Sequence, residues 1–441
     1  MVWALIRCLS PLQGHELRLL HLNLRLRYEM LIKPEESSGI LISHEVCLKM
    51  RLIFLILFMT SCKSTSSSLK LADLKRGFEN EKVEALWNEH IVKETQTNNT
   101  APSKALQDEC FPKFFPSKSV DRKGMVMLLH GFTACPQQFY DIANMLSTAG
   151  FDVFVPLLPG QGRKPSGDKD YLDDLPGQTT GFQARQHEDY ISFVSDMNGI
   201  AEASTGLKVI AGLSGGGGLA TGAVVTGQKA ERNIWDRALL YAPYYLNPGV
   251  VGAATDILAA IPYLGGTKSD WGDACRVNRS VEKAGGRDGY CSVTAQASQA
   301  MVQYGYVAAQ SIDKVKIPMQ FVGVEHDPTA DNQQIWKAFK RKNDATGQAA
   351  FCLYPKGVPH SIINPAQDLI PDLAEYQDLR GKDTPSGPPY EWVGPMQKHS
   401  VDFIERGTWF PTNNKKSKLE ERYFAADLCL PDSLDPNWNN K

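Results

Sequence analysis

The chain has 441 residues, 42% of them hydrophobic, and a formal net charge of −2. This length allows one large core with additions, and the small net charge argues against nucleic acid as a partner. The sequence contains no zinc-ligand spacing, phosphate-binding P-loop, dinucleotide-binding fingerprint or internal repeat, so we expect no metal and no cofactor.

An export-type segment lies near the N-terminus. A Lys-Met-Arg start at 49–51 precedes an apolar run at 52–59, and small residues then lead to Cys62. The run is shorter than the roughly 20 residues of a transmembrane helix and fits an export signal. Cys62 resembles the cysteine at which bacterial lipoproteins are cleaved and lipidated. The resemblance implies a membrane anchor through lipidated Cys62 in the bacterial cell envelope, and Lys63 favours the outer membrane. The alternative is a buried helix over 50–59 and an ordinary cysteine.

Strand and helix patterns alternate through the middle of the chain. Apolar runs at 125–129, 151–155, 209–213 and 238–242 predict buried strands. A helix over 142–149 should end at Gly150, and another carries one apolar face. That face comprises Tyr190, Phe193, Val194, Met197 and Ile200. The expected fold class is α/β, with a mainly parallel central sheet and helices on both faces.

Ser214 occupies the centre of a Gly-x-Ser-x-Gly motif at 212–216, directly after the predicted strand at 209–213. Gly212 and Gly216 lack the Cβ atoms that would collide where a chain turns sharply from strand to helix. Such a nucleophile elbow exposes the serine Oγ at the edge of a sheet. Close packing of a helix on a strand also requires small residues and is the alternative explanation.

A serine nucleophile needs a base and an orienting carboxylate, which follow it in this order: acid, then histidine. Asp327 follows an apolar run at 317–324, and His360 follows another at 349–354. We therefore predict Asp327 as the acid and His360 as the base. Glu325 and Asp331 flank the proposed acid and remain alternatives. Three other histidines fit less well by position: His187, His326 and His399.

Three motifs together carry a family resemblance. They are Leu-Leu-His-Gly-Phe-Thr-Ala at 128–134, Pro-Leu-Leu-Pro-Gly-Gln-Gly at 156–162 and Gly-Leu-Ser-Gly-Gly at 212–216. They resemble the carboxylesterase and monoacylglycerol-lipase branch of the α/β hydrolases, over about 120–245 and 315–365. In that family the backbone N–H groups of Phe132 and Gly215 would form the oxyanion hole. We interpret the side chain of His130 as that of a buried structural histidine that shapes the loop. Gln161 stands where the branch commonly has histidine.

The resemblance implies a metal-independent serine hydrolase that cleaves a small-molecule or lipid ester through an acyl-enzyme intermediate. A thioesterase or amidase could use the same three side chains. A non-catalytic lipoprotein that binds a lipid or a partner through a hydrolase-like fold is an alternative of a different class. The sequence makes no prediction about oligomeric state.

Six cysteines remain when Cys8, Cys47 and Cys62 are set aside. An even number suits an oxidising compartment, and Cys275 with Cys291 is the pair favoured by proximity, although fifteen connectivities are possible.

The expected domain organisation has five parts. Residues 1–49 are an upstream extension that is not native, with Met50 as the true start, and 50–61 form the lipoprotein signal peptide. Residues 62–110 provide a tether and an N-terminal helix, predicted over 69–90. Residues 111–410 form the α/β hydrolase domain, with a cap inserted at about 244–310. Residues 411–441 form a C-terminal tail.

Overall fold

The structure is a computed structural model. It describes residues 77–95, 106–107, 110–163, 185–228, 232–246, 268–270, 289–290, 292–324, 327, 329–354, 360–361, 363 and 393–410. The chain divides into two compact units, Met1–Lys75 and Arg76–Lys441, and every described residue belongs to the second. The predicted signal peptide, Cys62, Cys275, Cys291, most of the predicted cap and the tail lie outside the described residues. No helix in the described ranges is both long and apolar enough to cross a membrane.

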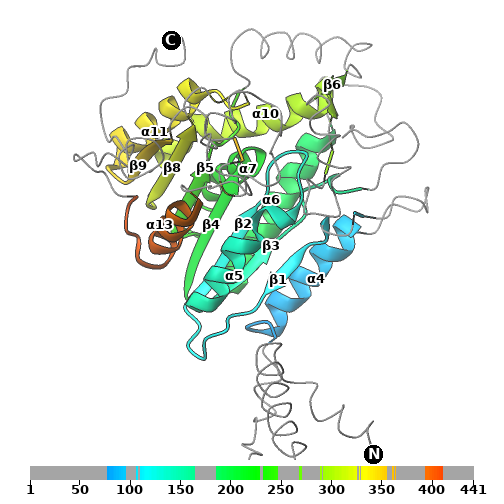
Figure 1. The fold of residues 1–441 in the computed structure, drawn as a ribbon, viewed down its shortest axis with the longest axis vertical. Coiled ribbons are helices and arrows are strands. Elements are labelled where there is room, and N and C mark those ends of the chain that lie inside the picture. The colour runs from blue at the N-terminus through cyan, green and yellow to red at the C-terminus, as the bar shows by residue number, and fades with distance from the viewer. Residues whose placement is uncertain are drawn as a thin grey trace, which may run out of the picture. The chain divides into compact units, whose positions relative to one another are not determined.

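The core is a seven-stranded sheet in the order β1-β3-β2-β4-β5-β8-β9 (Figure 1). The edge strand β1 (Lys113–Phe115) pairs antiparallel with β3 (Phe151–Val155), and every other pair is parallel. The other five strands are β2 (Gly124–Leu129), β4 (Leu207–Leu213), β5 (Arg237–Tyr241), β8 (Met319–Val324) and β9 (Ala349–Tyr354). Apolar, almost wholly buried strands are what a sheet covered on both faces requires. The predicted α/β class is confirmed.

Alternate residues of each strand face the two sides of the sheet. Val126 and Leu128 pack with α5 (Tyr140–Ala149) and α13 (Val393–Arg406), which lie together in front of the sheet in Figure 1. Met127 and Leu129 face the other side. That side is covered by α4 (Glu81–Thr95), α6 (Arg185–Ala203), α7 (Gly215–Thr226), α10 (Ala295–Gln310) and α11 (Asn332–Thr346). As predicted, α5 stops at Gly150, whose φ of 104° is left-handed. The five residues of the predicted apolar face of α6 are all buried.

The N-terminal helix α4 begins later than the sequence indicated. Asn80 Oδ1 accepts a hydrogen bond from the Val83 N–H at 2.9 Å, as an N-cap does. The helix therefore begins at Glu81 and continues to Thr95, beyond the predicted end at residue 90. Trp87 is its main anchor, because the indole is buried with its ring centroid 5.2 Å from that of Phe154 on β3.

Glu94, near the end of α4, is 6% exposed, and burial raises the pKa of its carboxyl to about 8. Since the folded pKa exceeds the usual 4.5, the unfolded chain releases this proton first. The associated stability is complete below about pH 4.5 and is lost as the pH rises through 8. We expect Glu94→Gln to be more stable than the wild type at pH 8 and equal to it at pH 4. Urea unfolding at both pH values measures this, with the exposed Glu84→Gln as the control on the same helix. A wild-type midpoint equal to that of Glu94→Gln at pH 8 would contradict it.

The described end of the predicted cap belongs to the core. A two-stranded antiparallel sheet joins β6 (Lys268–Asp270) to β7 (Ser292–Thr294). Thr294 then caps α10 by accepting a hydrogen bond from the Ala297 N–H. Helix α10 packs against α6 and α7. Its residue Met301 is fully buried in the same cluster as Leu129 of β2.

Candidate active site

Ser214 lies in the sharp turn between β4 and α7, with φ 55° and ψ −120°. Few non-glycine residues adopt a positive φ, so surrounding contacts must hold this conformation. The Ser214 N–H donates to the Tyr241 carbonyl at 2.8 Å. The Ser214 carbonyl accepts from the N–H groups of Gly218 and Tyr244, at 3.1 and 2.9 Å. The neighbouring strand β5 and the segment after it thus fix the backbone that presents the hydroxyl.

The motif glycines are required by close backbone contacts. A methyl group on Gly212 would collide with the Gly216 carbonyl, and one on Gly216 would collide with the carbonyl oxygens of Leu129 and His130. The start of α7 can therefore lie directly against the end of β2. Because β2 and β4 are adjacent parallel strands, the loop after β2 reaches the serine.

Asp327 and His360 meet at the same edge of the sheet, after β8 and β9. The His360 Nδ1 lies 2.7 Å from the Asp327 Oδ2. The other carboxylate oxygen, Oδ1, accepts hydrogen bonds from the N–H groups of Thr329 and Ala330 at 2.8 and 2.9 Å. The Asp327 carboxylate is thus held in one orientation, and an N–H on Nδ1 of His360 would donate to Oδ2. This leaves Nε2 as the ring nitrogen able to accept a proton.

Three of the residues considered as alternatives to Asp327 and His360 make other contacts in the structure. Asp331 caps α11, because its Oδ1 accepts from the N–H groups of Gln333 and Gln334. His187 on α6 contacts the ring of Tyr304, and His399 on α13 contacts that of Phe410. Glu325 and His326 lie outside the described residues.

The predicted oxyanion-hole residues are close neighbours. A methyl group on Gly215 would lie 3.2 Å from the backbone nitrogen of Phe132, and one on Gly131 would lie 3.7 Å from the Ser214 Cβ. Gly215 is also the first residue of α7, where the helix dipole favours negative charge. The two amides thus flank the serine turn. A methyl group on Gly215 would also lie 2.9 Å from the Phe132 Cβ and 3.2 Å from the Met301 Sδ, so two apolar side chains lie beside it.

His130 is fully buried and ties two loops together. Its Nε2 accepts a hydrogen bond from the Leu158 N–H at 3.0 Å, so its proton is on Nδ1, which lies 2.9 Å from the Gly131 carbonyl oxygen. Burial lowers the pKa of the imidazole to about 4, so it is neutral at pH 7. His130 therefore shapes the loop, as the sequence indicated. Gln161 is also fully buried, and neither of its amide atoms has a hydrogen-bond partner among the described residues.

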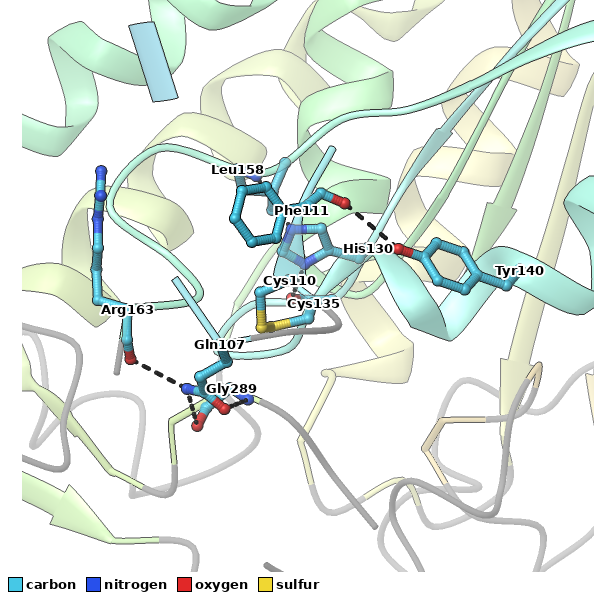
Figure 2. Close-up of a disulfide and its surroundings, with 10 residues drawn as sticks. Gln107, Cys110, Phe111, His130, Cys135, Tyr140, Leu158, Arg163 and Gly289 are labelled. Atoms are coloured by element: carbon cyan, nitrogen blue, oxygen red, sulfur yellow. Dashed lines mark hydrogen bonds between the residues drawn. A yellow bond between two sulfur atoms is a disulfide. The ribbon is translucent and has the colours of Figure 1, made fainter. Parts of the chain in front are cut away.

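A disulfide between Cys110 and Cys135 secures the loop that follows Phe132 (Figure 2). Beside it, the Gln107 side chain forms hydrogen bonds with the backbone N–H and carbonyl of Gly289 and with the carbonyl of Arg163. Three segments far apart in sequence therefore meet at this loop. The sequence left the pairing among fifteen connectivities and did not single out this one. Cys352 on β9 is disulfide-bonded as well.

Removing this disulfide should lower stability. Because it closes a loop between residues 25 positions apart, its loss is expected to reduce the free energy of unfolding by about 3 kcal/mol. The Cys110→Ala/Cys135→Ala double variant, compared with the wild type by urea unfolding without reductant, measures this. An unchanged unfolding midpoint would show that the bond does not constrain the chain. Reductant alone is a poorer test, because it also affects Cys352.

No group of His, Cys, Asp or Glu side chains in the described ranges is arranged to hold a metal ion. Sequence reasoning missed Gln138, which lies in the 3₁₀ turn η2 (Pro136–Phe139) and bonds to the loops of both Phe132 and His360. No motif marks this residue, because its partners are a backbone amide and a serine that no pattern singles out.

The chain was compared with protein families, curated proteins and solved structures. A family model described as serine aminopeptidase, S33, matches residues 120–366. No curated protein matches the sequence. Similar solved structures include a soluble variant of monoglyceride lipase from Saccharomyces cerevisiae, with 17% identity, a TM-score of 0.46 and coverage of 71% of this chain and 98% of that chain. A monoacylglycerol lipase from Paleococcus ferrophilus has 14% identity, a TM-score of 0.44 and coverage of 68% and 99%.

Proposed function

Because the chain belongs to the serine aminopeptidase S33 family, we propose that it is a serine hydrolase of carboxylic esters in which Ser214, His360 and Asp327 form a catalytic triad. The observation that carries the proposal is the 2.7 Å contact between His360 Nδ1 and Asp327 Oδ2. It occurs at the sheet edge where β4 ends in the strained turn of Ser214.

The proposed reaction has two halves. Ser214 Oγ attacks the ester carbonyl while His360 Nε2 takes the hydroxyl proton, and Asp327 stabilises the resulting imidazolium. The N–H groups of Phe132 and Gly215 donate to the tetrahedral oxyanion. The intermediate collapses to an acyl-enzyme as His360 gives its proton to the departing alcohol. Water, activated by His360, then attacks the acyl group and releases the acid and the free serine.

A series of p-nitrophenyl esters tests the reaction and the acyl site together. We expect turnover of these esters, with kcat/KM rising from acetate to butyrate or longer chains. The reason is that apolar side chains, Phe132 and Met301, lie beside Gly215. Absence of turnover across the series from acetate to palmitate would contradict the ester assignment.

Amide hydrolysis is the second candidate, because the matching family model is described as an aminopeptidase. The same nucleophile and base can cleave either bond, so the leaving group decides. Amino-acid p-nitroanilides, measured beside the esters at equal concentration, separate the two. Faster turnover of an anilide than of every ester would favour the aminopeptidase activity.

We also propose that the protein is anchored in the bacterial envelope, at the outer membrane, through lipid on Cys62. The sequence around Cys62 supports this, and disulfide-bonded cysteines such as Cys110 and Cys135 are typical of exported proteins. In a bacterial host, the wild type should fractionate with membranes and carry a lipid-modified N-terminal cysteine by mass spectrometry. Cys62→Ala should lose both properties. Membrane association of Cys62→Ala equal to that of the wild type would contradict the anchor.

A further inference from the structure

Gln138 bonds to both loops that carry the proposed chemistry. Its side chain is 4% exposed. The Oε1 accepts a hydrogen bond from the Gly131 N–H at 2.7 Å, and the Nε2 donates to the Ser361 Oγ at 3.3 Å. The amide orientation follows from these partners, because a backbone N–H can only donate. Gly131 precedes Phe132, and Ser361 follows His360, so one amide joins the oxyanion loop to the histidine loop.

The sheet itself provides no such link. The two loops follow β2 and β9, and three strands, β4, β5 and β8, lie between them. Hydrogen bonds of the sheet therefore fix each loop relative to its own neighbours only. The Gln138 bridge spans this separation at the edge where the proposed triad lies.

The turn that carries Gln138 is firmly held. Cys135 forms the N-cap of η2 and is bonded to Cys110, and Pro136 restricts the first residue of the turn. The Gln138 N–H donates to the Cys135 carbonyl at 3.2 Å. Phe139, the next residue, is fully buried in the core. The side-chain amide of Gln138 therefore extends from a backbone segment that is held in place.

We propose that Gln138 is a positioning residue that sets the geometry of the oxyanion loop relative to His360, an inference that rests on the proposed function. The Gly131 N–H belongs to the peptide directly before the Phe132 amide, so holding it orients the donor to the oxyanion. The bond to the Ser361 hydroxyl tethers the residue that follows His360, whose ring Nδ1 contacts Asp327. Gln138 acts on the relation between these groups and does not touch the substrate.

Gln138→Met removes both bonds while keeping the length of the side chain. We expect kcat for a p-nitrophenyl ester to fall about 10- to 100-fold, because small misplacement of catalytic groups is costly. The KM should change by less than about 3-fold, since ground-state binding is retained. The rate of inactivation by a fluorophosphonate should fall in parallel with kcat. The matched control is Gln320→Met, which removes a buried glutamine that bonds to Ala350 and Phe410. This control should lose thermal stability and keep kcat.

Ser361 provides a second, independent test. Ser361→Ala should lower kcat, Ser361→Thr should restore it by keeping a hydroxyl, and adding Ser361→Ala to Gln138→Met should have little further effect. If Gln138→Met does not fold, the two Ser361 variants decide. Unchanged kcat in Gln138→Met, a loss of thermal stability alone, or equal activities of Ser361→Ala and Ser361→Thr would overturn the inference while the proposed function stands. A wild type that neither hydrolyses esters or anilides nor reacts with fluorophosphonate overturns both.

Discussion

Replacing Ser214 with alanine is expected to lower kcat by about 10⁴- to 10⁶-fold, with KM nearly unchanged. The hydroxyl is the proposed nucleophile, and alanine offers no atom that can form the acyl-enzyme. The fold should survive, because the backbone of Ser214 is held by bonds to Tyr241, Gly218 and Tyr244 that need no side chain. Steady-state kinetics with p-nitrophenyl butyrate measure the change. Thermal unfolding shows whether the variant is intact.

Ser400→Ala is the matched control for this substitution. Ser400 is a fully buried serine on α13, across the sheet from α7, and its hydroxyl bonds to Tyr241 and Met396. Its loss should reduce thermal stability and leave kcat unaltered. If Ser214→Ala hydrolysed the ester at the wild-type rate, another residue would have to be the nucleophile.

Asp327→Asn is expected to lower kcat by about 10⁴-fold. The N–H groups of Thr329 and Ala330 require an acceptor at the Oδ1 position, so the asparagine carbonyl must face them. The asparagine NH₂ then faces His360 and forces Nδ1 to accept. The imidazole proton moves to Nε2, which can no longer take the proton of Ser214. Activity should recover only as another base, such as hydroxide at high pH, replaces the histidine.

Asp331→Asn is the control for this variant, because it removes a different carboxylate near the site. Asp331 caps α11 through the same kind of bonds, to Gln333 and Gln334, and asparagine is an equally good N-cap. Its activity should match that of the wild type. A large loss in Asp331→Asn, together with an active Asp327→Asn, would make Asp331 the acid and contradict the assignment.

Much of the fold could be predicted because buried parallel strands leave long apolar runs. The strands at 151–155 and 349–354 have their predicted bounds. The edge strand β1 is three residues long and lacks such a run, so it escaped prediction. The start of α4 depends on the N-cap residue Asn80, whereas the apolar spacing that predicted the helix begins before this residue. Hydrophobic periodicity locates helices, whereas a cap determines where they begin.

In the candidate site, too, local motifs could be recognised in the sequence, whereas contacts between distant segments could not. Ser214 and His130 could be proposed because each belongs to a local motif after a strand, and Asp327 and His360 because each follows a predicted strand in the order acid, then histidine. Gln138, Ser361 and the pairing of Cys110 with Cys135 could not. The disulfide joins residues 25 positions apart and the Gln138–Ser361 bond residues 223 positions apart, and such contacts depend on the complete fold rather than on neighbouring residues.

The most direct measurement is to treat the purified protein with a fluorophosphonate and map the adduct by peptide mass spectrometry. Only an activated serine reacts, so we predict a single phosphonylated residue, Ser214, and loss of ester hydrolysis in proportion to the labelled fraction. The Asp331→Asn protein should label as the wild type does. Esterase activity that persists at full labelling of Ser214, or inactivation with the adduct on a different serine, would contradict the account.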